Sequence, residues 1–96
     1  MDRNFEVTLN EKAERFETTV GGLTAELRYR LEGNRLLLVH TGVPRPIEGR
    51  GVGSALVRAA VEEGVRRSSK IVPLCWFARG WLERHPEVAA GADVEW

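Results

Sequence analysis

The stretch VPRPIEGRGVGSAL, residues 43–56, joins an apolar run to a long helical pattern through two prolines and three alternating glycines. Gly49, Gly51 and Gly53 have no Cβ, so their backbone can adopt positive φ and lie close against a ligand. The helix predicted to follow begins with N–H groups that have no intrahelical partner, and its dipole favours an anion. This segment therefore predicts a phosphate-binding loop.

Two common phosphate-binding motifs do not fit this loop. A Walker loop requires a Gly-Lys pair, and the sequence contains none. The dinucleotide-binding fingerprint requires a third glycine where Ser54 stands and follows a strand directly, whereas Pro44 and Pro46 interrupt this turn. The loop therefore excludes a P-loop NTPase and disfavours a Rossmann dinucleotide-binding domain.

Strand patterns precede the loop. Apolar and polar residues alternate in three short segments, which predicts strands with one face turned inward. A fourth segment is more uniformly apolar, as in a central strand covered on both faces. The predicted strands are 5–9, 15–20, 23–31 and 35–43. Because short turns join them, they predict an antiparallel meander.

Helical periodicity follows the loop. It predicts a long helix over 51–67 and a second helix over 76–84, separated by a buried strand over 70–74. A crossover of strand, helix and strand places this last strand parallel to the strand at 35–43. The second helix ends at a His-Pro pair, where His85 would cap the terminus.

Residue spacing also predicts which helix faces are buried. One arc of the first helix would pack on the sheet, with Glu63 and Arg67 on the solvated side. The residues of this arc are Gly53, Leu56, Val57, Ala60, Val61, Gly64 and Val65. The aromatic residues Trp76, Phe77 and Trp81 are predicted to belong to the core. Beyond the second helix, the pattern supports only a short strand over 94–96.

Composition limits the class of protein. The 96 residues predict a single domain over 1–96, and the 14 basic and 14 acidic residues give no net charge that would attract nucleic acid or a membrane. No apolar run approaches the roughly twenty residues that span a bilayer. The start has no apolar signal segment, and the single cysteine, Cys75, has no disulfide partner. We expect a cytoplasmic protein without nucleic acid, membrane or metal partners.

The segment Glu48-Gly49-Arg50-Gly51-Val52-Gly53 resembles the pyrophosphate loop of the GNAT superfamily of acetyl-CoA-dependent N-acetyltransferases, which reads Gln/Arg-x-x-Gly-x-Gly/Ala before a helix. Glu48 replaces the usual Gln or Arg. The segments HTGVP at 40–44, VPLC at 72–75 and RHPE at 84–87 extend the resemblance to a small, single-domain branch of the superfamily. The resemblance implies a mixed α/β fold in which a four-strand meander is followed by a helix crossover to a parallel strand and a C-terminal helix.

The resemblance also implies where acetyl-CoA would bind. The pantetheine arm would enter the gap between the parallel strands, between 39–43 and 71–75, and backbone N–H groups of 39–43 would polarise the thioester carbonyl. The implied cofactor-binding residues are Val39, Thr41, Val43, Gly49, Arg50, Gly51, Val52, Gly53 and Ser54.

Two side chains are candidates for the chemistry. Cys75 lies between a strand end and a helix start, where a helix N-terminus favours a thiolate, and related small proteins carry a cysteine there. It could act as a nucleophile, as an acid, or as a small buried hydrophobe. His40 could act as a general base if it faces the cleft, although a structural histidine is the alternative. Alternation puts His40 and Leu38 on one face of the strand.

The predicted activity is transfer of an acetyl group from acetyl-CoA to an amine. A protein or peptide amine fits, because the sequence starts directly with strands and lacks the helices that help to build the acceptor site in larger relatives. The protein would act as a monomer or as a homodimer that completes the site. The alternative is a non-catalytic CoA or acyl-CoA sensor or interaction module, because the only tyrosine, Tyr29, lies in a meander strand and cannot supply the family's usual acid.

Overall fold

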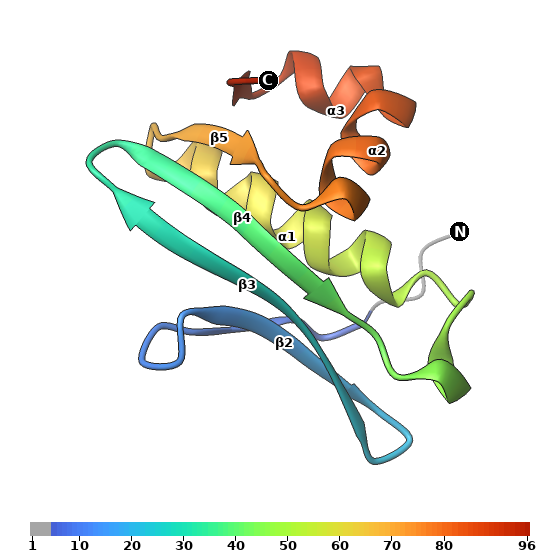
Figure 1. The fold of residues 1–96 in the computed structure, drawn as a ribbon. Coiled ribbons are helices and arrows are strands. Elements are labelled where there is room, and N and C mark those ends of the chain that lie inside the picture. The colour runs from blue at the N-terminus through green and yellow to red at the C-terminus, as the bar shows by residue number, and fades with distance from the viewer. Residues whose placement is uncertain (1–4) are drawn as a thin grey trace.

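The strands of the sheet are arranged in the order of the sequence. In the computed structural model, which describes residues 5–96, six strands lie in the order β1-β2-β3-β4-β5-β6. The first four are antiparallel, whereas β5 is parallel to β4 and β6 is parallel to β5 (Figure 1). The elements are β1 (Thr8–Asn10), β2 (Arg15–Val20), β3 (Leu23–Glu32), β4 (Arg35–Gly42), η1 (Arg45–Ile47), α1 (Val52–Arg66), β5 (Lys70–Pro73), α2 (Trp76–Arg84), α3 (Pro86–Ala90) and β6 (Asp93–Val94).

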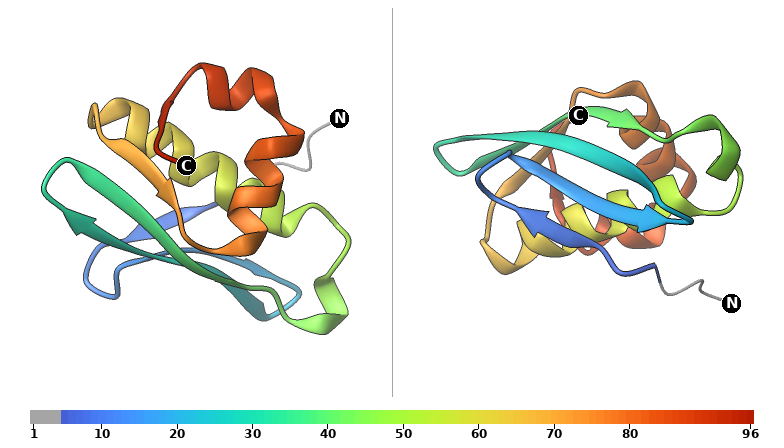
Figure 2. Two further views of the ribbon diagram at one scale, coloured as in Figure 1. Left: turned by 45° about the horizontal axis from the view of Figure 1, so that its top comes forward. Right: turned by 90° about the horizontal axis from the view of Figure 1, so that it is seen from below.

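Helices α1 and α2 pack on the same face of this sheet (Figures 1 and 2). Right-handed crossovers that add strands in one direction place their helices on one face. A single cluster of buried residues joins Leu56 and Trp81 of the helices to Leu38 and Ile71 of the strands. The core therefore lies between the helices and one face of the sheet.

The centre of β4 is buried on both faces as predicted, with Leu37 only 5% exposed, but helices cover one face alone. Leu36 and Leu38 belong to the core under the helices, so Leu37 faces the other side of the sheet. Its neighbour Val72 on β5 lies outside the same core cluster. Within residues 5–96 the three helices leave this second face uncovered (Figure 2). The uniform apolar run of β4 indicated burial but could not show that helices cover only one side.

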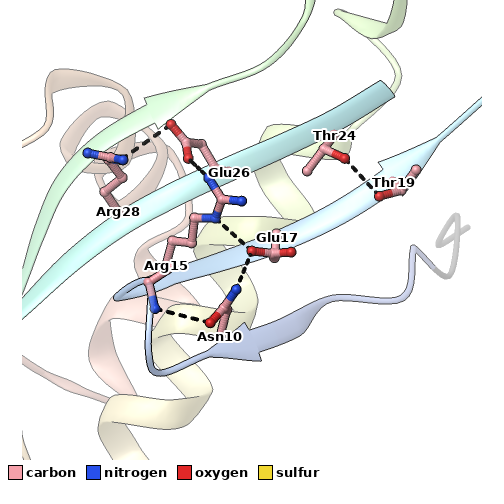
Figure 3. A network of polar contacts seen from close by, with 8 residues as sticks. Asn10, Arg15, Glu17, Thr19, Thr24, Glu26 and Arg28 are labelled. Carbon is pink, nitrogen blue, oxygen red and sulfur yellow. Dashed lines mark hydrogen bonds and ion pairs between the residues drawn. The ribbon is translucent and has the colours of Figure 1, made fainter. Parts of the chain in front are cut away.

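The uncovered face carries a network of charged side chains from neighbouring strands (Figure 3). Arg15 on β2 donates to Glu17 at 2.6 Å and to Glu26 on β3 at 2.8 Å. Asn10 also donates to Glu17, at 3.0 Å, and Arg28 lies 3.4 Å from Glu26. These contacts cross three adjacent strands and hold them in register.

Most predicted elements are confirmed, and the differences have local causes. The last three meander strands, the long helix, the parallel strand and the second helix lie within two residues of their predicted limits. The first strand is shorter than predicted, because only Thr8–Asn10 pair with β2, although Phe5 and Val7 still pack against the core. Helix α3 was missed, because Pro86 was interpreted only as a stop signal, whereas proline is also favoured at the first position of a helix. The 3₁₀ turn η1 was not predicted either.

Three predictions about side-chain burial are also wrong. Val65 is 49% exposed, because it lies past the edge of the arc on α1 that faces the sheet. Glu63 is only 8% exposed and accepts hydrogen bonds from Arg66 and Arg67, so it is not a solvated charge. Trp76, predicted as core, is 83% exposed, while Trp81 is buried as predicted.

Candidate functional site

A gap opens between the two central parallel strands. β4 and β5 pair only as far as Leu38 and Pro73, and the N–H of Cys75 then donates to the carbonyl of Leu38 at 2.9 Å. Beyond this point the chain turns into α2, whereas β4 continues to Gly42 (Figure 1). The edge of β4 beyond Leu38 therefore has no neighbouring strand on the β5 side.

A β-bulge changes the direction of side chains along this edge. Tyr29 pairs with Leu38 and Arg28 pairs with His40, so Val39 is inserted without a partner on β3. Leu38 and His40 consequently point to opposite faces, and the prediction that they share a face is wrong. Regular alternation in the sequence could not reveal the inserted residue.

Two of the three loop glycines have the positive φ that the sequence analysis allowed, whereas Gly53 lies inside α1. Gly49 and Gly51 have φ of 78° and 88°, a left-handed region that favours glycine. Gly51 is also the N-cap of α1, and the first helical hydrogen bond runs from the N–H of Ala55 to its carbonyl at 3.0 Å. The N–H groups of the three residues between them, 52–54, therefore have no intrahelical partner.

Gly53 and Ser54 fix α2 against the start of α1. A Cβ on Gly53 would lie 2.6 Å from Cζ of Phe77, so only glycine permits this close approach. The indole Nε1 of Trp81 donates to Oγ of Ser54 at 2.8 Å. His85 stacks on Trp81 with ring centroids 3.9 Å apart, and its Nδ1 donates to the Trp81 carbonyl, which confirms His85 as a cap. The second wall of the gap is therefore rigidly held.

These parts enclose a cleft of about 660 Å³. It extends from the glycine loop, along the free edge of β4, to the β5–α2 junction. The lining residues are Val39, His40, Thr41, Val43, Glu48, Gly49, Gly51, Val52, Gly53, Ser54, Leu74, Cys75, Trp76, Phe77, Trp81 and Arg84. The structure thus brings together the predicted site residues except Arg50, which is exposed and does not line the cleft.

The two predicted catalytic residues differ in their placement. Cys75 is 8% exposed, and its Sγ lies 3.4 Å from Oγ1 of Thr41, which faces the same side of β4 as the helices. His40 also lines the cleft, but its Nε2 lies near Gly42, on the face that carries Glu26. The geometry thus favours Cys75 over His40 for a role inside the cleft.

Tyr29 lies outside the cleft, as the sequence predicted. Its side chain is 4% exposed and its ring lies 5.3 Å from that of Phe16, centroid to centroid. Burial raises the pKa of its hydroxyl above the usual value, with a further contribution from the negative charge of Glu11. The hydroxyl therefore stays protonated within the core.

Sequence reasoning missed several residues of the cleft. Leu74 and Arg84 gave no distinctive signal, since a leucine after a strand and an arginine in the last turn of a helix are both common. Arg84 follows Phe77 and Trp81 at spacings of seven and three residues, and this helical period could have placed it on the same wall. Glu48, which replaces the usual Gln or Arg of the loop, also lines the cleft.

Within residues 5–96, His, Cys, Asp and Glu side chains form no group of three that could hold a metal ion. None of the helices described is both long enough and apolar enough to cross a membrane.

Comparison with known proteins decides the family. Residues 15–91 match the family described as GCN5-related N-acetyl-transferase. The chain belongs to this family. It is accordingly an N-acetyltransferase, and transfer of an acetyl group is the family's chemistry. The match confirms the resemblance that the glycine loop and its neighbouring segments suggested.

Individual relatives agree with this assignment. Protein NATD1 of Gallus gallus is 30% identical over 84% of this chain and 76% of its own length, and the Mus musculus protein is 32% identical over 88% and 69%. A GCN5-like protein from Staphylococcus aureus, solved by NMR in solution, has a TM-score of 0.73 and 29% identity. The match covers 98% of this chain and 91% of that protein, so the predicted GNAT-like fold is confirmed.

Proposed function

We propose that this N-acetyltransferase binds acetyl-CoA in the cleft between β4 and β5 and transfers the acetyl group to an amine. The observation that supports this most is the cleft itself, which joins a glycine loop, a helix N-terminus and a free strand edge in one continuous space of about 660 Å³. Such a site offers backbone donors at one end and apolar walls along its length. Acetyl-CoA has phosphates at one end and a thioester at the other.

The residues present fit such a donor. Gly49 and Gly51 leave the backbone accessible, and the unpaired N–H groups of 52–54 would bind the pyrophosphate. Val39, Val43 and Phe77 offer apolar contact along the cleft for the pantetheine arm. When bound, acetyl-CoA supplies an activated thioester carbonyl. The free N–H groups of β4 would polarise that carbonyl.

The pair of Cys75 and Thr41 marks the end of the cleft where the chemistry would occur. Thr41 holds the thiol at hydrogen-bond distance, 3.4 Å, where the strands part. The amine would attack the thioester directly, losing a proton and releasing CoA as its thiolate. Alternatively, the Cys75 sulfur would first accept the acetyl group, releasing CoA, and then be released itself when the amine takes the acetyl group. In both routes we place the acetyl group beside Cys75. Substitution of Cys75 therefore tests where in the cleft the transfer occurs.

The rim of the cleft suits a large acceptor. Trp76 and Leu74, at the β5–α2 junction, are 83% and 59% exposed. The uncovered face of the sheet also meets the cleft, because Val43 lines both this cleft and a shallow hollow beside Glu26. A protein or peptide amine could therefore approach without steric hindrance. Tyr29 is buried elsewhere, an observation that favours the alternative of a CoA-binding sensor without turnover.

Gly51→Val tests binding, with Gly33→Val as its matched control. Both glycines have positive φ, 88° and 61°, but Gly33 lies in the turn between β3 and β4, at the far end of the sheet (Figure 1). Both substitutions should cost a similar stability, roughly 1–2 kcal/mol. Calorimetric titration should show at least about a tenfold weaker affinity for acetyl-CoA only in Gly51→Val, which corresponds to about 1.4 kcal/mol.

The same titration separates the two functions. Equal affinity in both variants would contradict the proposed site. Tight binding by the wild-type protein, without acetylation of any amine in a broad peptide panel, would favour the sensor.

A further inference from the structure

Arg84, at the end of α2, lines the cleft although the loop-based prediction did not include it. Among the described lining residues it is the one lysine or arginine, and it faces a cleft to which Glu48 adds a carboxylate. Within residues 5–96 no carboxylate oxygen lies within 4.0 Å of its guanidinium nitrogens. Arg79 of the same helix, in contrast, pairs with Glu83 at 3.5 Å.

The packing of α2 places Arg84 beside the start of α1. Phe77, Trp81 and Arg84 follow one face of the helix at i, i+4 and i+7. Phe77 contacts Gly53, and Trp81 donates to Ser54. Arg84 continues this line by one turn. Because Trp81 is also stacked on His85, the turn that carries Arg84 is held in place.

Gly80 shows the direction of the Arg84 side chain. A Cβ on Gly80 would lie 3.2 Å from an Nη1 atom of Arg84, so the guanidinium folds back along α2 toward its N-terminus. It does not extend toward the C-terminal carbonyls, which would be the usual position for a cation that only balances the helix dipole. A glycine inside a helix is unfavourable, and here it leaves space for the guanidinium.

We infer that Arg84 binds a phosphate group of the CoA moiety from the wall opposite the glycine loop. This inference rests on the proposed function. A guanidinium presents paired N–H donors that match phosphate oxygens, and it offsets the charge of Glu48 in the same cleft. Arg50, predicted for this purpose, is exposed outside the lining. Arg84 thereby contributes to selection of CoA over donors that lack phosphates.

The test compares three ligands with the wild-type chain and Arg84→Gln. CoA carries a pyrophosphate and a 3′-phosphate, dephospho-CoA carries only the pyrophosphate, and pantetheine carries neither. Loss of a charged hydrogen bond predicts about a tenfold weaker affinity of Arg84→Gln for CoA. Affinity for pantetheine, followed by NMR titration, should not change. Arg30→Gln, on the exposed part of β3, controls for the loss of one positive charge.

Dephospho-CoA identifies the phosphate that Arg84 contacts. An equal loss for CoA and dephospho-CoA would support contact with the pyrophosphate, and a loss for CoA alone would support contact with the 3′-phosphate. Unchanged CoA affinity, or an equal loss for pantetheine, would overturn the inference. If the wild-type chain fails to bind CoA, the proposed function itself is wrong. If the wild-type chain binds CoA and Arg84→Gln binds it equally well, only the inference about Arg84 is wrong.

Gly80→Val provides a second variant that keeps Arg84. Its side chain would occupy the space of the guanidinium, and valine is no worse than glycine inside a helix. We expect an unchanged or higher melting temperature together with several-fold weaker CoA binding. Unchanged CoA binding in this variant would count against the direction assigned to Arg84.

Discussion

Cys75 is the one thiol of the chain, and its position makes its chemistry directly measurable. It is buried at the point where β4 and β5 part, next to the hydroxyl of Thr41. A buried cysteine can be a simple packing residue, but a packing residue needs no hydrogen-bonding partner at the end of a cleft. We therefore propose that this residue takes part in the acetyl transfer.

Cys75→Ser should lower kcat while leaving the affinity for acetyl-CoA and the melting temperature nearly unchanged. Serine keeps the size and a hydrogen bond to Thr41 but is a much weaker nucleophile and acid than the thiol. We expect a loss of about 100-fold in kcat. Alkylation of the single thiol, slowed by added acetyl-CoA, would report its position in the cleft independently. An unchanged kcat would assign Cys75 to packing.

At this scale the sequence predicted glycines better than it predicted side-chain direction. Gly49 and Gly51 have the positive φ expected of them, since glycine is the residue that adopts it freely. The predicted direction of the His40 side chain was wrong. The bulge at Val39 arises from strand pairing, so the alternation of apolar and polar residues does not indicate it. Arg84 was missed for a related reason, since its place in the cleft depends on where α2 packs.

The antiparallel strands β1, β2 and β3 are held by charges as well as by their ladder. Glu17 accepts hydrogen bonds from Arg15 and Asn10 on the uncovered face (Figure 3). The Arg15 guanidinium, followed by the Asn10 amide, lowers the pKa of the Glu17 carboxyl below its usual value. Correspondingly, the hydrogen bonds to Glu17 and then Glu26 raise the pKa of Arg15.

This network predicts a loss of stability in acid. A carboxyl whose pKa is lowered by folding stabilises the protein above the unfolded value, about 4.3 for glutamate. That stability is lost as the pH falls through the lower folded value. Glu17→Gln should therefore lower the melting temperature at pH 6, and the difference from wild type should vanish toward pH 2.5. The exposed Glu62 of α1, replaced by Gln, is the control. A difference that persists at low pH would show that the effect is not ionic.

Element boundaries were predictable where one pattern was strong. The alternation of β3 and the long helical period of α1 set their limits to within two residues. The ends of the chain were less predictable, because β1 and β6 contain three and two residues and depend on pairing with their neighbours. Helix α3 has five residues and no buried one, so no periodic signal could identify it.

The whole molecule is a sheet with helices on one face and charges on the other. The order of the first five strands and the parallel crossover followed from the sequence, because short turns and right-handed crossovers leave few alternatives. The uncovered face could not be predicted, because the sequence pattern of an apolar strand is the same whether a helix or only neighbouring side chains cover it. The resulting shape gives the cleft an open rim. Trp76 lies at this rim, and the uncovered face of the sheet adjoins it.

We propose that acetyl-CoA binds between β4 and β5, and an NMR titration can locate it there. A chain of 10.8 kDa gives resolved amide signals, so addition of acetyl-CoA locates the contact residue by residue. We predict the largest shifts at amides 39–43, 49–54 and 74–77, with little change in the β1–β2 turn. Shifts confined to the uncovered sheet face, or no shifts at millimolar acetyl-CoA, would contradict the claim.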